Sequence, residues 1–367
     1  MKTLKDANIQ NKTVLLRADL DLSEGSDLRL AATVPTIKFL LENNCKVVIV
    51  GHKGRPNGKI DDEFSLFPVF EKLKLYFPKK DADDFKFVSS ILSKEAKEII
   101  GQAKFGDIIM LENLRFYPGE EENDLAFTEY LASLANVYVN DAFGVCHRQH
   151  ASITGIVKFI PGYAGLRLQE EVEKLKQAME KPAYPAVAII GGAKLETKLP
   201  VISKMAEIYD FVLVGGKMAI NKDVILRNKE TKDSDELSRH PEEAERRRIP
   251  LINNSKIILS TDYIGEEKLD IGPETIKNFT EIILKAKTVI WNGPMGKIED
   301  ERFIHGTKMI ASAIIESRAF SIVGGGDTIA ALEKINLLDK FSWISTGGGA
   351  MLEFLAGERL PGIEVLK

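Results

Sequence analysis

The sequence predicts an α/β protein built from two doubly wound, Rossmann-like parallel-sheet domains. Short apolar runs rich in Val and Ile recur along the chain. The runs are continuous rather than alternating, which is typical of strands buried on both faces of a parallel sheet. Between them lie longer segments with apolar residues three and four positions apart, as in amphipathic helices. Strand–helix alternation over the whole chain indicates the doubly wound class.

The expected elements follow from these two patterns. In chain order, the predicted strands are Val14–Leu20, Lys46–Gly51, Asp107–Leu111, Val137–Val139, Ala186–Ile190, Phe211–Val214, Lys256–Leu259, Thr288–Trp291, Phe320–Val323 and Phe341–Ile344. The predicted helices are Thr33–Glu42, Asp124–Leu134, Pro200–Ile208 and Thr328–Lys334. The first helix is expected to start near Pro35, which leaves Arg29 just ahead of it.

A charged amphipathic segment, Leu168–Glu180, marks a boundary in the middle of the chain. Pro182 and Pro185 stop this helix, and a new strand begins at Ala186. We interpret the segment as a helix that joins two domains of similar size. The expected divisions are an N-terminal domain over residues 1–160, an interdomain helix and linker over 161–184, and a C-terminal domain over 185–352.

Composition places the chain among ordinary soluble globular proteins. Its 367 residues are 44% hydrophobic and 28% charged, with a formal net charge of -4. Nothing global indicates a nucleic-acid partner, so any anion site must be local. The two cysteines predict reduced thiols in a cytoplasmic protein. No apolar leader or run of about 20 apolar residues predicts export or a membrane span. The charged segment Asn221–Arg248 is expected to form a solvated helix and loop.

Ligands of open parallel sheets bind outside the carboxyl ends of the strands. In the N-terminal half, cationic residues gather at these ends. An arginine presents a planar fork of donors that suits phosphate and carboxylate oxygens, and several arginines at one edge need an anion between them. The sequence therefore predicts a site for a small polyanion. Its candidate residues are Arg17, Asp19, Asp21, Arg29, His52, Arg55, Arg115, His147, Arg148 and His150.

In the C-terminal half, glycine clusters follow the strands instead. They are Gly191–Lys194, Gly215–Met218, Asn292–Gly296, Gly324–Thr328 and Thr346–Ala350. Glycine lets the backbone approach a nucleotide closely, and a cluster at the start of a helix offers amides to a phosphate. Asp327, inside one cluster, is the candidate ligand for Mg²⁺, directly or through water.

Three familiar nucleotide motifs are absent from the sequence. There is no G-x-x-x-x-G-K-[ST], no G-x-G-x-x-G with a following acidic residue, and no H-R-D and D-F-G pair. The pattern left is one half that binds a polyanion and one that binds a nucleotide. Phosphoryl transfer needs in-line positioning, charge neutralisation and exclusion of water, which closure of two domains over a cleft provides.

Several stretches, in order and over nearly the whole chain, together resemble the phosphoglycerate kinase family. They are Arg17–Asp21, His52–Pro56, Leu111–Phe116, Asp141–Arg148, Gly191–Lys194, Asp270–Thr275, Trp291–Gly296, Gly324–Thr328 and Ser345–Ala350. The resemblance implies reversible phosphoryl transfer between ATP and 3-phosphoglycerate in glycolysis and gluconeogenesis, giving ADP and 1,3-bisphosphoglycerate. It further implies Mg²⁺ bound with the nucleotide, a hinge-bending cytoplasmic monomer with its active site in the interdomain cleft, and a tail, 353–367, packed back on the N-terminal domain.

The resemblance also assigns roles to residues. For catalysis it implies Arg29, Lys198, Gly325 and Gly326. For binding of 3-phosphoglycerate it implies Asp19, Leu20, Asp21, Arg29, His52, Lys53, Gly54, Arg55, Arg115 and Arg148. For the nucleotide it implies Gly192, Ala193, Lys194, Lys198, Gly216, Asn292, Pro294, Glu299, Gly325, Gly326, Asp327 and Thr328, with Asp327 also at the metal.

The chain departs from the family pattern at a few positions. Asp21 stands where the family usually has Asn, Lys53 where it has Leu, and Lys217 replaces a glycine near the expected adenosine pocket. Two alternatives stay open beside the main interpretation. One is a kinase for another small acceptor, which Asp21 and Lys53 allow; the other is a relative that binds nucleotide without turnover, which the retained Arg29, Lys198 and Asp327 disfavour.

Overall fold

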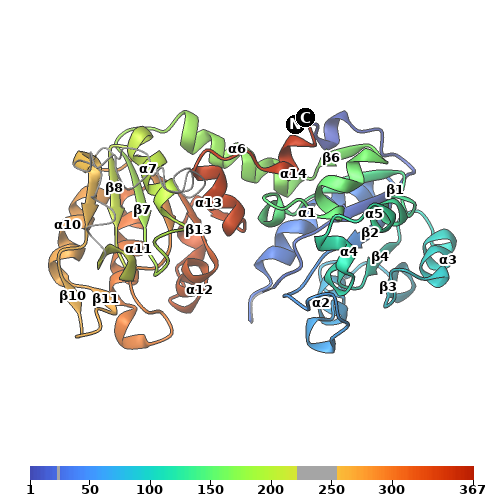
Figure 1. Cartoon of the computed structure of the whole chain (residues 1–367), viewed down its shortest axis with the longest axis horizontal. Coiled ribbons are helices and arrows are strands. Elements are labelled where there is room, and N and C mark those ends of the chain that lie inside the picture. Colours follow the sequence, from blue (N-terminus) through green and yellow to red (C-terminus); the bar gives the residue numbers. More distant parts are fainter. Residues whose placement is uncertain (23–24, 221–253) are drawn as a thin grey trace, which may run out of the picture. The chain divides into compact units, whose positions relative to one another are not determined.

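A computed structural model describes residues 1–22, 25–220 and 254–367 of the chain. Two compact units make it up: unit 1 holds Met1–Glu173 and Arg359–Lys367, and unit 2 holds Lys174–Glu358. Figure 1 labels their elements. The predicted charged helix and loop, Asn221–Arg248, lies outside the described residues. In the described ranges, no helix is long and apolar enough to cross a membrane.

Unit 1 is built on a six-stranded, all-parallel sheet in the order β3-β4-β2-β1-β5-β6. The strands are β1 (Thr13–Arg17), β2 (Lys46–Val50), β3 (Phe85–Val88), β4 (Ile108–Leu111), β5 (Val137–Asn140) and β6 (Gly162–Ala164). Neither β3 nor β6 was expected from the sequence. Both are edge strands whose residues are mostly half-buried, so they lack the continuous apolar run of the inner strands.

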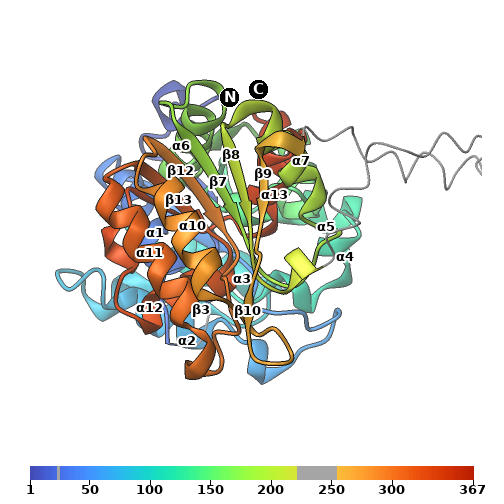
Figure 2. The same cartoon turned by 90° about the vertical axis from the view of Figure 1, so that its left-hand side faces the viewer.

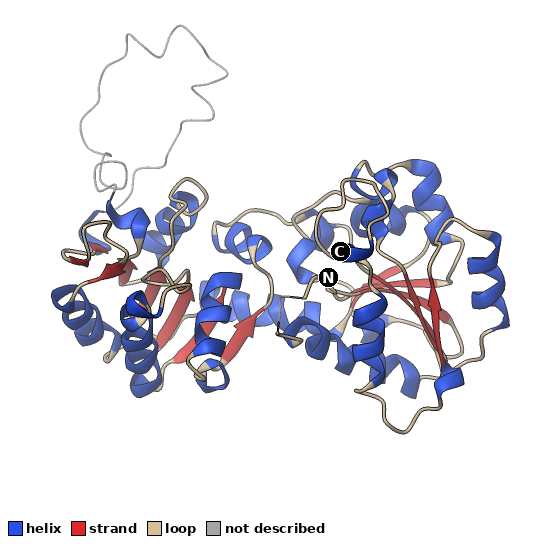
Figure 3. Ribbon diagram, turned by 90° about the horizontal axis from the view of Figure 1, so that it is seen from below, coloured by secondary structure: helices blue, strands red, loops and turns tan. Residues whose placement is uncertain are grey.

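The helices of unit 1 cover both faces of its sheet. They are α1 (Leu28–Glu42), α2 (Phe67–Lys74), α3 (Lys94–Gln102), α4 (Pro118–Glu121), α5 (Leu125–Ala132) and α14 (Pro361–Glu364), and α6 (Leu166–Glu180) starts here as well. Figure 3 shows the strands in red with helices around them. The helix α1 begins at Leu28 rather than near Pro35, so Pro35 lies inside it and Arg29 lies in its first turn. This corrects the expected position of Arg29.

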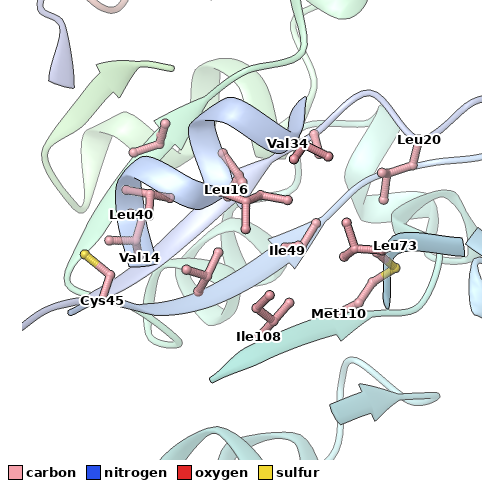
Figure 4. Packing of buried hydrophobic residues seen from close by; sticks show 14 of the residues in the cluster. Val14, Leu16, Leu20, Val34, Leu40, Cys45, Ile49, Leu73, Ile108 and Met110 are labelled. Atoms are coloured by element: carbon pink, nitrogen blue, oxygen red, sulfur yellow. The ribbon is translucent and has the colours of Figure 1, made fainter. Parts of the chain in front are cut away.

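Alternate residues of the central strands pack into two separate cores. Leu16 of β1 and Ile49 of β2 pack with α1 and α2 on one face, as Figure 4 shows. Leu15 and Val48, their sequence neighbours, pack with α3 and α5 on the other face. Successive side chains of a strand point to opposite faces, so a strand covered on both sides is expected to show a near-continuous apolar run. This is why the apolar runs predicted the parallel sheet.

Unit 2 repeats this architecture with a second six-stranded parallel sheet in the order β14-β13-β12-β7-β8-β9. Its strands are β7 (Ala186–Ile190), β8 (Phe211–Val214), β9 (Ile257–Leu259), β12 (Thr288–Asn292), β13 (Phe320–Gly324) and β14 (Trp343–Ser345). A short antiparallel pair, β10 (Tyr263–Ile264) and β11 (Asp270–Ile271), stands apart from the sheet. The two sheets establish the predicted α/β class.

The helices of unit 2 also lie on both faces of its sheet. They are α7 (Leu199–Ile208), α10 (Pro273–Ile283), α11 (His305–Ser317), α12 (Gly326–Lys334) and α13 (Gly349–Leu355). Figure 2 shows α10 and α11 on one face and α7 and α13 on the other. Phe279 of α10 and Ile310 of α11 join the buried core around Trp291 of β12. Because α13 packs on α7, the terminal segment that belongs to unit 1 starts at Arg359, not at residue 353.

Both ends of the chain meet in unit 1. The N–H of Lys2 donates to the carbonyl of Leu366 at 2.6 Å, and Thr3 forms a parallel bridge with Ala164 of β6. Figures 1 and 3 show the two termini side by side. The terminal segment is thus fixed to the edge of the unit 1 sheet by backbone hydrogen bonds.

In each sheet, the chain places later strands on both sides of the first strand, so the order of the strands reverses there. In unit 1 the chain adds β2 on one side of β1 and β5 on the other; in unit 2 it adds β8 on one side of β7 and β12 on the other. At such a point the loops after two neighbouring strands diverge and leave a crevice at the carboxyl edge. Most candidate residues of both halves follow these strands, whereas Arg115 follows β4 and Gly325–Thr328 follow β13.

Candidate active site

The side chains of Asp19, Asp21 and Arg29 lie close together after β1 in unit 1. The Nη1 of Arg29, in the first turn of α1, donates to the carbonyl of Asp21 at 2.8 Å and to Oδ1 of Asp19 at 3.3 Å. Asp19 is buried, and burial raises the pKa of its carboxyl even though Arg29 and Arg17 oppose that rise. Arg29 itself keeps 27% of its side chain exposed, so its charge is held in place and open to a ligand.

The loop after β2 is fixed on two sides. The N–H of Gly54 donates to Oδ1 of Asp21 at 2.8 Å, and Nη1 of Arg115 donates to the Gly54 carbonyl at 2.8 Å. Gly54 has a φ of +61°, and a Cβ there would lie 2.3 Å from the Phe64 ring, so only glycine fits. Arg115 belongs to the 3-10 helix η4 (Leu114–Phe116), which follows β4. The loops after three strands are therefore joined.

The structure brings most, not all, of the predicted residues of unit 1 together. Arg55 and Arg148 are exposed, and among the described residues neither side chain has a hydrogen-bond or ion-pair partner. The side chain of Lys53 donates to the Glu63 carbonyl at 2.6 Å. Leu20 is 1% exposed, and its side chain packs in the core, so only its backbone faces the site.

Arg17 was a candidate for the anion site, but the family resemblance gave it no specific role. It is fully buried, and its Nη2 lies 3.1 Å from Nδ1 of His52. His52 is buried too; burial, then the charges of Arg17, Arg115 and Arg29, lower its pKa well below 6.5. His52 is therefore neutral at physiological pH. An arginine at the end of a strand signalled a cation, but nothing in the sequence indicated that it lies behind a histidine.

The crevice of unit 2 contains a cavity of about 360 Å³ at the carboxyl ends of β7, β8 and β12. The predicted residues among its lining are Gly192, Ala193, Gly216, Pro294, Glu299 and Asp327. The cavity is also lined by Lys217, Lys268 and Lys297. Of these three lysines, the sequence had drawn attention only to Lys217, as a departure from the family pattern. Lys194, in contrast, is exposed and does not line the cavity.

Close backbone approach shapes this crevice. Gly293 has a φ of +96°, and a Cβ there would lie 2.1 Å from the carbonyl oxygen of Gly191. The Nζ of Lys198, at the start of α7, donates to the same carbonyl at 2.5 Å. Burial lowers the pKa of Lys198 to about 8, although Asp327 opposes the shift. A largely buried ammonium group thus stands at the point where β7 and β12 diverge.

The N-terminus of α12 is prepared for an anion. Its first turn carries Asp327 and Thr328, and Gly325 precedes it with a φ of +96°. The N–H of Gly293 donates to the hydroxyl of Thr328 at 2.7 Å, which joins this turn to the end of β12. The buried Nδ2 of Asn292 has no hydrogen-bond acceptor among the described residues and would lie 3.0 Å from a Cβ on Gly325. An unpaired donor beside a helix N-terminus fits a phosphate oxygen.

Asp327 is the only predicted metal ligand, and its exposed carboxylate fits Mg²⁺. Within the described ranges, no three His, Cys, Asp or Glu residues are grouped so as to hold a metal. Mg²⁺ is commonly bound through one or two carboxylates together with the phosphates of a nucleotide. One carboxylate beside a phosphate-binding helix N-terminus is such a donor set.

Comparison with known proteins agrees with this geometry. The family model described as "Phosphoglycerate kinase" matches residues 4–358. The phosphoglycerate kinase of Dictyoglomus turgidum is 41% identical over 99% of this chain and 98% of its own length, and that of Finegoldia magna is 40% identical over 100% and 98%. The solved phosphoglycerate kinase structure from Pyrococcus horikoshii matches with a TM-score of 0.82 and 32% identity over 100% of this chain and 98% of its own. The solved phosphoglycerate kinase structure from Coxiella burnetii matches with a TM-score of 0.77 and 33% identity over 99% of this chain and 98% of its own. The chain belongs to the phosphoglycerate kinase family.

Proposed function

We infer that this chain transfers the terminal phosphoryl group of ATP to the carboxylate of 3-phosphoglycerate, reversibly, giving ADP and 1,3-bisphosphoglycerate. This proposal rests on one observation: the carboxyl edge of each of the two sheets presents groups that can bind an anion. Unit 1 offers a charged, partly exposed Arg29 beside buried cationic residues, and unit 2 offers a helix N-terminus beside Lys198. Two anionic substrates and a phosphoryl group in transit require positive charge in both places.

Each site residue has a proposed task that follows from its surroundings. Arg29 neutralises charge on the transferred phosphoryl group, because its guanidinium is fixed by Asp19 and Asp21 and cannot lose its proton. His52 and Arg115 hold the acceptor, with Arg55 and Arg148 as exposed cations that contact its phosphate. Lys198, Asn292 and the first turn of α12 hold the phosphates of the nucleotide. Mg²⁺, held by Asp327, would neutralise phosphate charge when it is bound.

Neither cysteine is prepared to carry the phosphoryl group covalently. Burial raises the pKa of Cys45 to about 11 and that of Cys146 to about 12, so both remain protonated thiols. We therefore propose direct transfer between the substrates. Direct transfer needs the acceptor carboxylate aligned with the terminal phosphate, and it needs water excluded.

We also propose that the protein acts as a cytoplasmic monomer whose units close on their substrates, as the family resemblance implies. Exclusion of water during transfer is the physical reason for closure. Small-angle scattering measures the radius of gyration, which should fall when both MgATP and 3-phosphoglycerate are added. Light scattering coupled to size exclusion should give the mass of one chain, 40.8 kDa.

The direct test is turnover of purified protein with MgATP and 3-phosphoglycerate. Formation of 1,3-bisphosphoglycerate is followed through a dehydrogenase that consumes NADH. The variant Arg29→Ala should lower kcat by several orders of magnitude, within the range that loss of an arginine finger gives, about 10³–10⁵. Arg302→Ala is the matched control, because Arg302 is exposed and forms its ion pair with Asp300. Near-normal kcat in Arg29→Ala would refute the assigned role.

A negative result in this assay is also informative. If the protein binds MgATP but does not phosphorylate 3-phosphoglycerate, a panel of small carboxylate acceptors compared by kcat/KM separates a changed acceptor from lost activity. Asp21 is the observation behind this control, since its carboxylate lies at the acceptor edge, 3.8 Å from Nη1 of Arg29.

A further inference from the structure

A buried carboxylate with no role in the scheme above lies behind the unit 1 site. Glu120, in the short helix α4, is 0% exposed. Its Oε1 accepts the hydroxyl of Ser152 at 2.6 Å, and its Oε2 accepts the N–H of Ser152 at 3.0 Å. The Nδ1 of His150 lies 3.7 Å from Oε1. Burial alone would raise the pKa of Glu120, but His150, Arg17 and Ser152 together lower it, so this carboxyl is ionised.

Ser152 connects this carboxylate to Arg17. A serine hydroxyl has one hydrogen to donate, and here it goes to Glu120. The oxygen is thereby left as an acceptor, and it accepts the Nε–H of Arg17 at 2.9 Å. The guanidinium of Arg17 also donates to the Ala18 carbonyl at 2.7 Å. Arg17 is thus held at two of its nitrogens, and the third, Nη2, is directed at His52.

The contact with Arg17 determines which nitrogen of His52 carries the proton. A guanidinium can only donate, so the Nδ1 of His52, 3.1 Å from Nη2 of Arg17, must accept. A neutral imidazole with an accepting Nδ1 carries its hydrogen on Nε2. That Nε2 lies on the site side, 3.9 Å from Oδ2 of Asp21. Because Arg17 itself is fully buried, its side chain makes its hydrogen-bond contact with the site at His52.

We propose that Glu120 is a positioning residue of the acceptor site: through Ser152 and Arg17 it holds His52 as the neutral tautomer whose Nε2–H is offered to the anionic acceptor. The identity of that acceptor rests on the function proposed above, whereas the tautomer does not. If Glu120 served only as a counter-ion for buried Arg17, its loss would lower stability but leave the proton of His52 where it is.

The tautomer is measured directly by NMR of the full chain with ¹⁵N-labelled histidine. The sequence has five histidines, and a His52→Gln variant assigns the signal of interest. In the unmodified protein at neutral pH, His52 should be a single tautomer with its proton on Nε2. In Ser152→Ala, Arg17 loses the acceptor of its Nε–H. In Glu120→Gln, an amide NH₂ replaces one of the two oxygens that accept from Ser152, so the Ser152 hydroxyl is no longer fixed as an acceptor for Arg17. In both variants both tautomers should be populated. Glu122→Gln, an exposed carboxylate next to α4, should leave the tautomer unchanged.

Kinetics give the second readout. A group that orients a binding residue should affect substrate binding more than the chemical step, so the KM for 3-phosphoglycerate should rise about tenfold in both variants while kcat stays within about threefold. Far-UV circular dichroism and the unfolding midpoint of each variant verify that it is folded. Ser152→Ala removes only one hydroxyl, so it decides the question if Glu120→Gln does not fold.

Two results would overturn the proposal. One is a proton on Nδ1, or a charged imidazolium, for His52 in the unmodified protein. The other is a folded Ser152→Ala variant with the same single tautomer and unchanged KM. If the tautomers mix as expected in the variants but the unmodified protein does not phosphorylate 3-phosphoglycerate, the positioning role stands and the proposed function fails, so the two failures are distinguishable.

Discussion

The carboxylate of Asp21 accepts the backbone N–H of Gly54 at 2.8 Å and so connects the loop after β1 to the loop after β2. The same carboxylate lies 3.8 Å from Nη1 of Arg29 and 3.9 Å from Nε2 of His52. It therefore has two opposed effects at an anion site. Its oxygen shapes the loop, whereas its negative charge occupies cations that an anionic acceptor would use.

Replacing Asp21 with Asn separates these two effects. Asn retains an oxygen that accepts the Gly54 N–H, but it carries no charge. We expect the KM for 3-phosphoglycerate to fall by roughly three- to tenfold, because a like charge near the acceptor is removed. Steady-state kinetics at fixed MgATP measure this change. Asp21→Ala is the control: it also removes the oxygen, so the loop is released and the KM should not fall. An increase of KM in Asp21→Asn would show that the charge assists binding.

We expect Lys198 to be essential for turnover, and we expect its buried charge to lower the stability of the folded protein. Its ammonium is largely buried, and burial lowers its pKa from 10.5 to about 8. Lys198→Met should lower kcat on the order of 10²- to 10³-fold, as loss of a charge-stabilising donor does. The same variant should unfold at a higher temperature near neutral pH, because a buried charge is replaced by an apolar chain of similar length.

The pH dependence of that stability difference has a defined sign. The unfolded chain holds the proton of this lysine up to about pH 10.5, whereas the folded protein releases it near 8. The cost of the buried charge is therefore complete below about pH 8 and disappears as the pH rises towards 10.5. Thermal unfolding of Lys198→Met and the unmodified protein at several pH values verifies this. Lys204→Met, half-exposed on the same helix, should show no such convergence.

Asp141 should make the stability of unit 1 decrease as the pH rises towards neutrality. It is 1% exposed at the end of β5, and burial raises its pKa from 3.8 to about 7, although the N–H groups of Arg167 and Leu168 donate to its Oδ1. Between these values the folded state binds more protons than the unfolded state. Its contribution to stability is therefore complete below pH 3.8 and is lost as the pH rises through about 7.

The variant Asp141→Asn tests this expectation. Asn accepts the same two hydrogen bonds through its oxygen, but it does not titrate. The difference in unfolding midpoint between the variant and the unmodified protein should increase from about pH 5 to about pH 8 in favour of the variant. Urea unfolding at the two pH values measures it. A difference that is independent of pH would mean that Asp141 does not titrate in this range.

Asp327 should set the Mg²⁺ requirement. It lies in the first turn of α12, where the helix N-terminus favours the phosphates that carry the ion. Asp327→Asn should lower kcat/KM for MgATP at least about tenfold and raise the Mg²⁺ concentration needed for half-maximal rate. The control is Asp339→Asn, an exposed carboxylate paired with Lys340. An unchanged Mg²⁺ titration would exclude Asp327 as the protein's ligand to this ion.

The sequence by itself determined the class of fold, because a strand covered by helices on both faces shows a near-continuous apolar run, as do the middle residues of β1, β2 and β12 and all of β7. It also placed cations after the strands of one half and glycines after those of the other. The sequence did not predict the edge strand β3, because its half-buried residues form no continuous apolar run. It also misplaced the start of α1, because Pro35, which was expected near the first turn, lies inside the helix.

Only the tertiary structure decided which of these residues act together. Arg17 and Ser152 are 135 positions apart, and no local pattern relates them, yet one hydrogen bond joins them behind His52. Likewise, Gly191 and Gly293 have to be glycine because β7 and β12 are neighbours in the sheet. That neighbourhood follows from the order of the strands in the sheet, which no local sequence pattern reveals. Periodicity reports the burial of a residue, whereas site geometry depends on contacts between distant segments, and these exist only once the chain has folded.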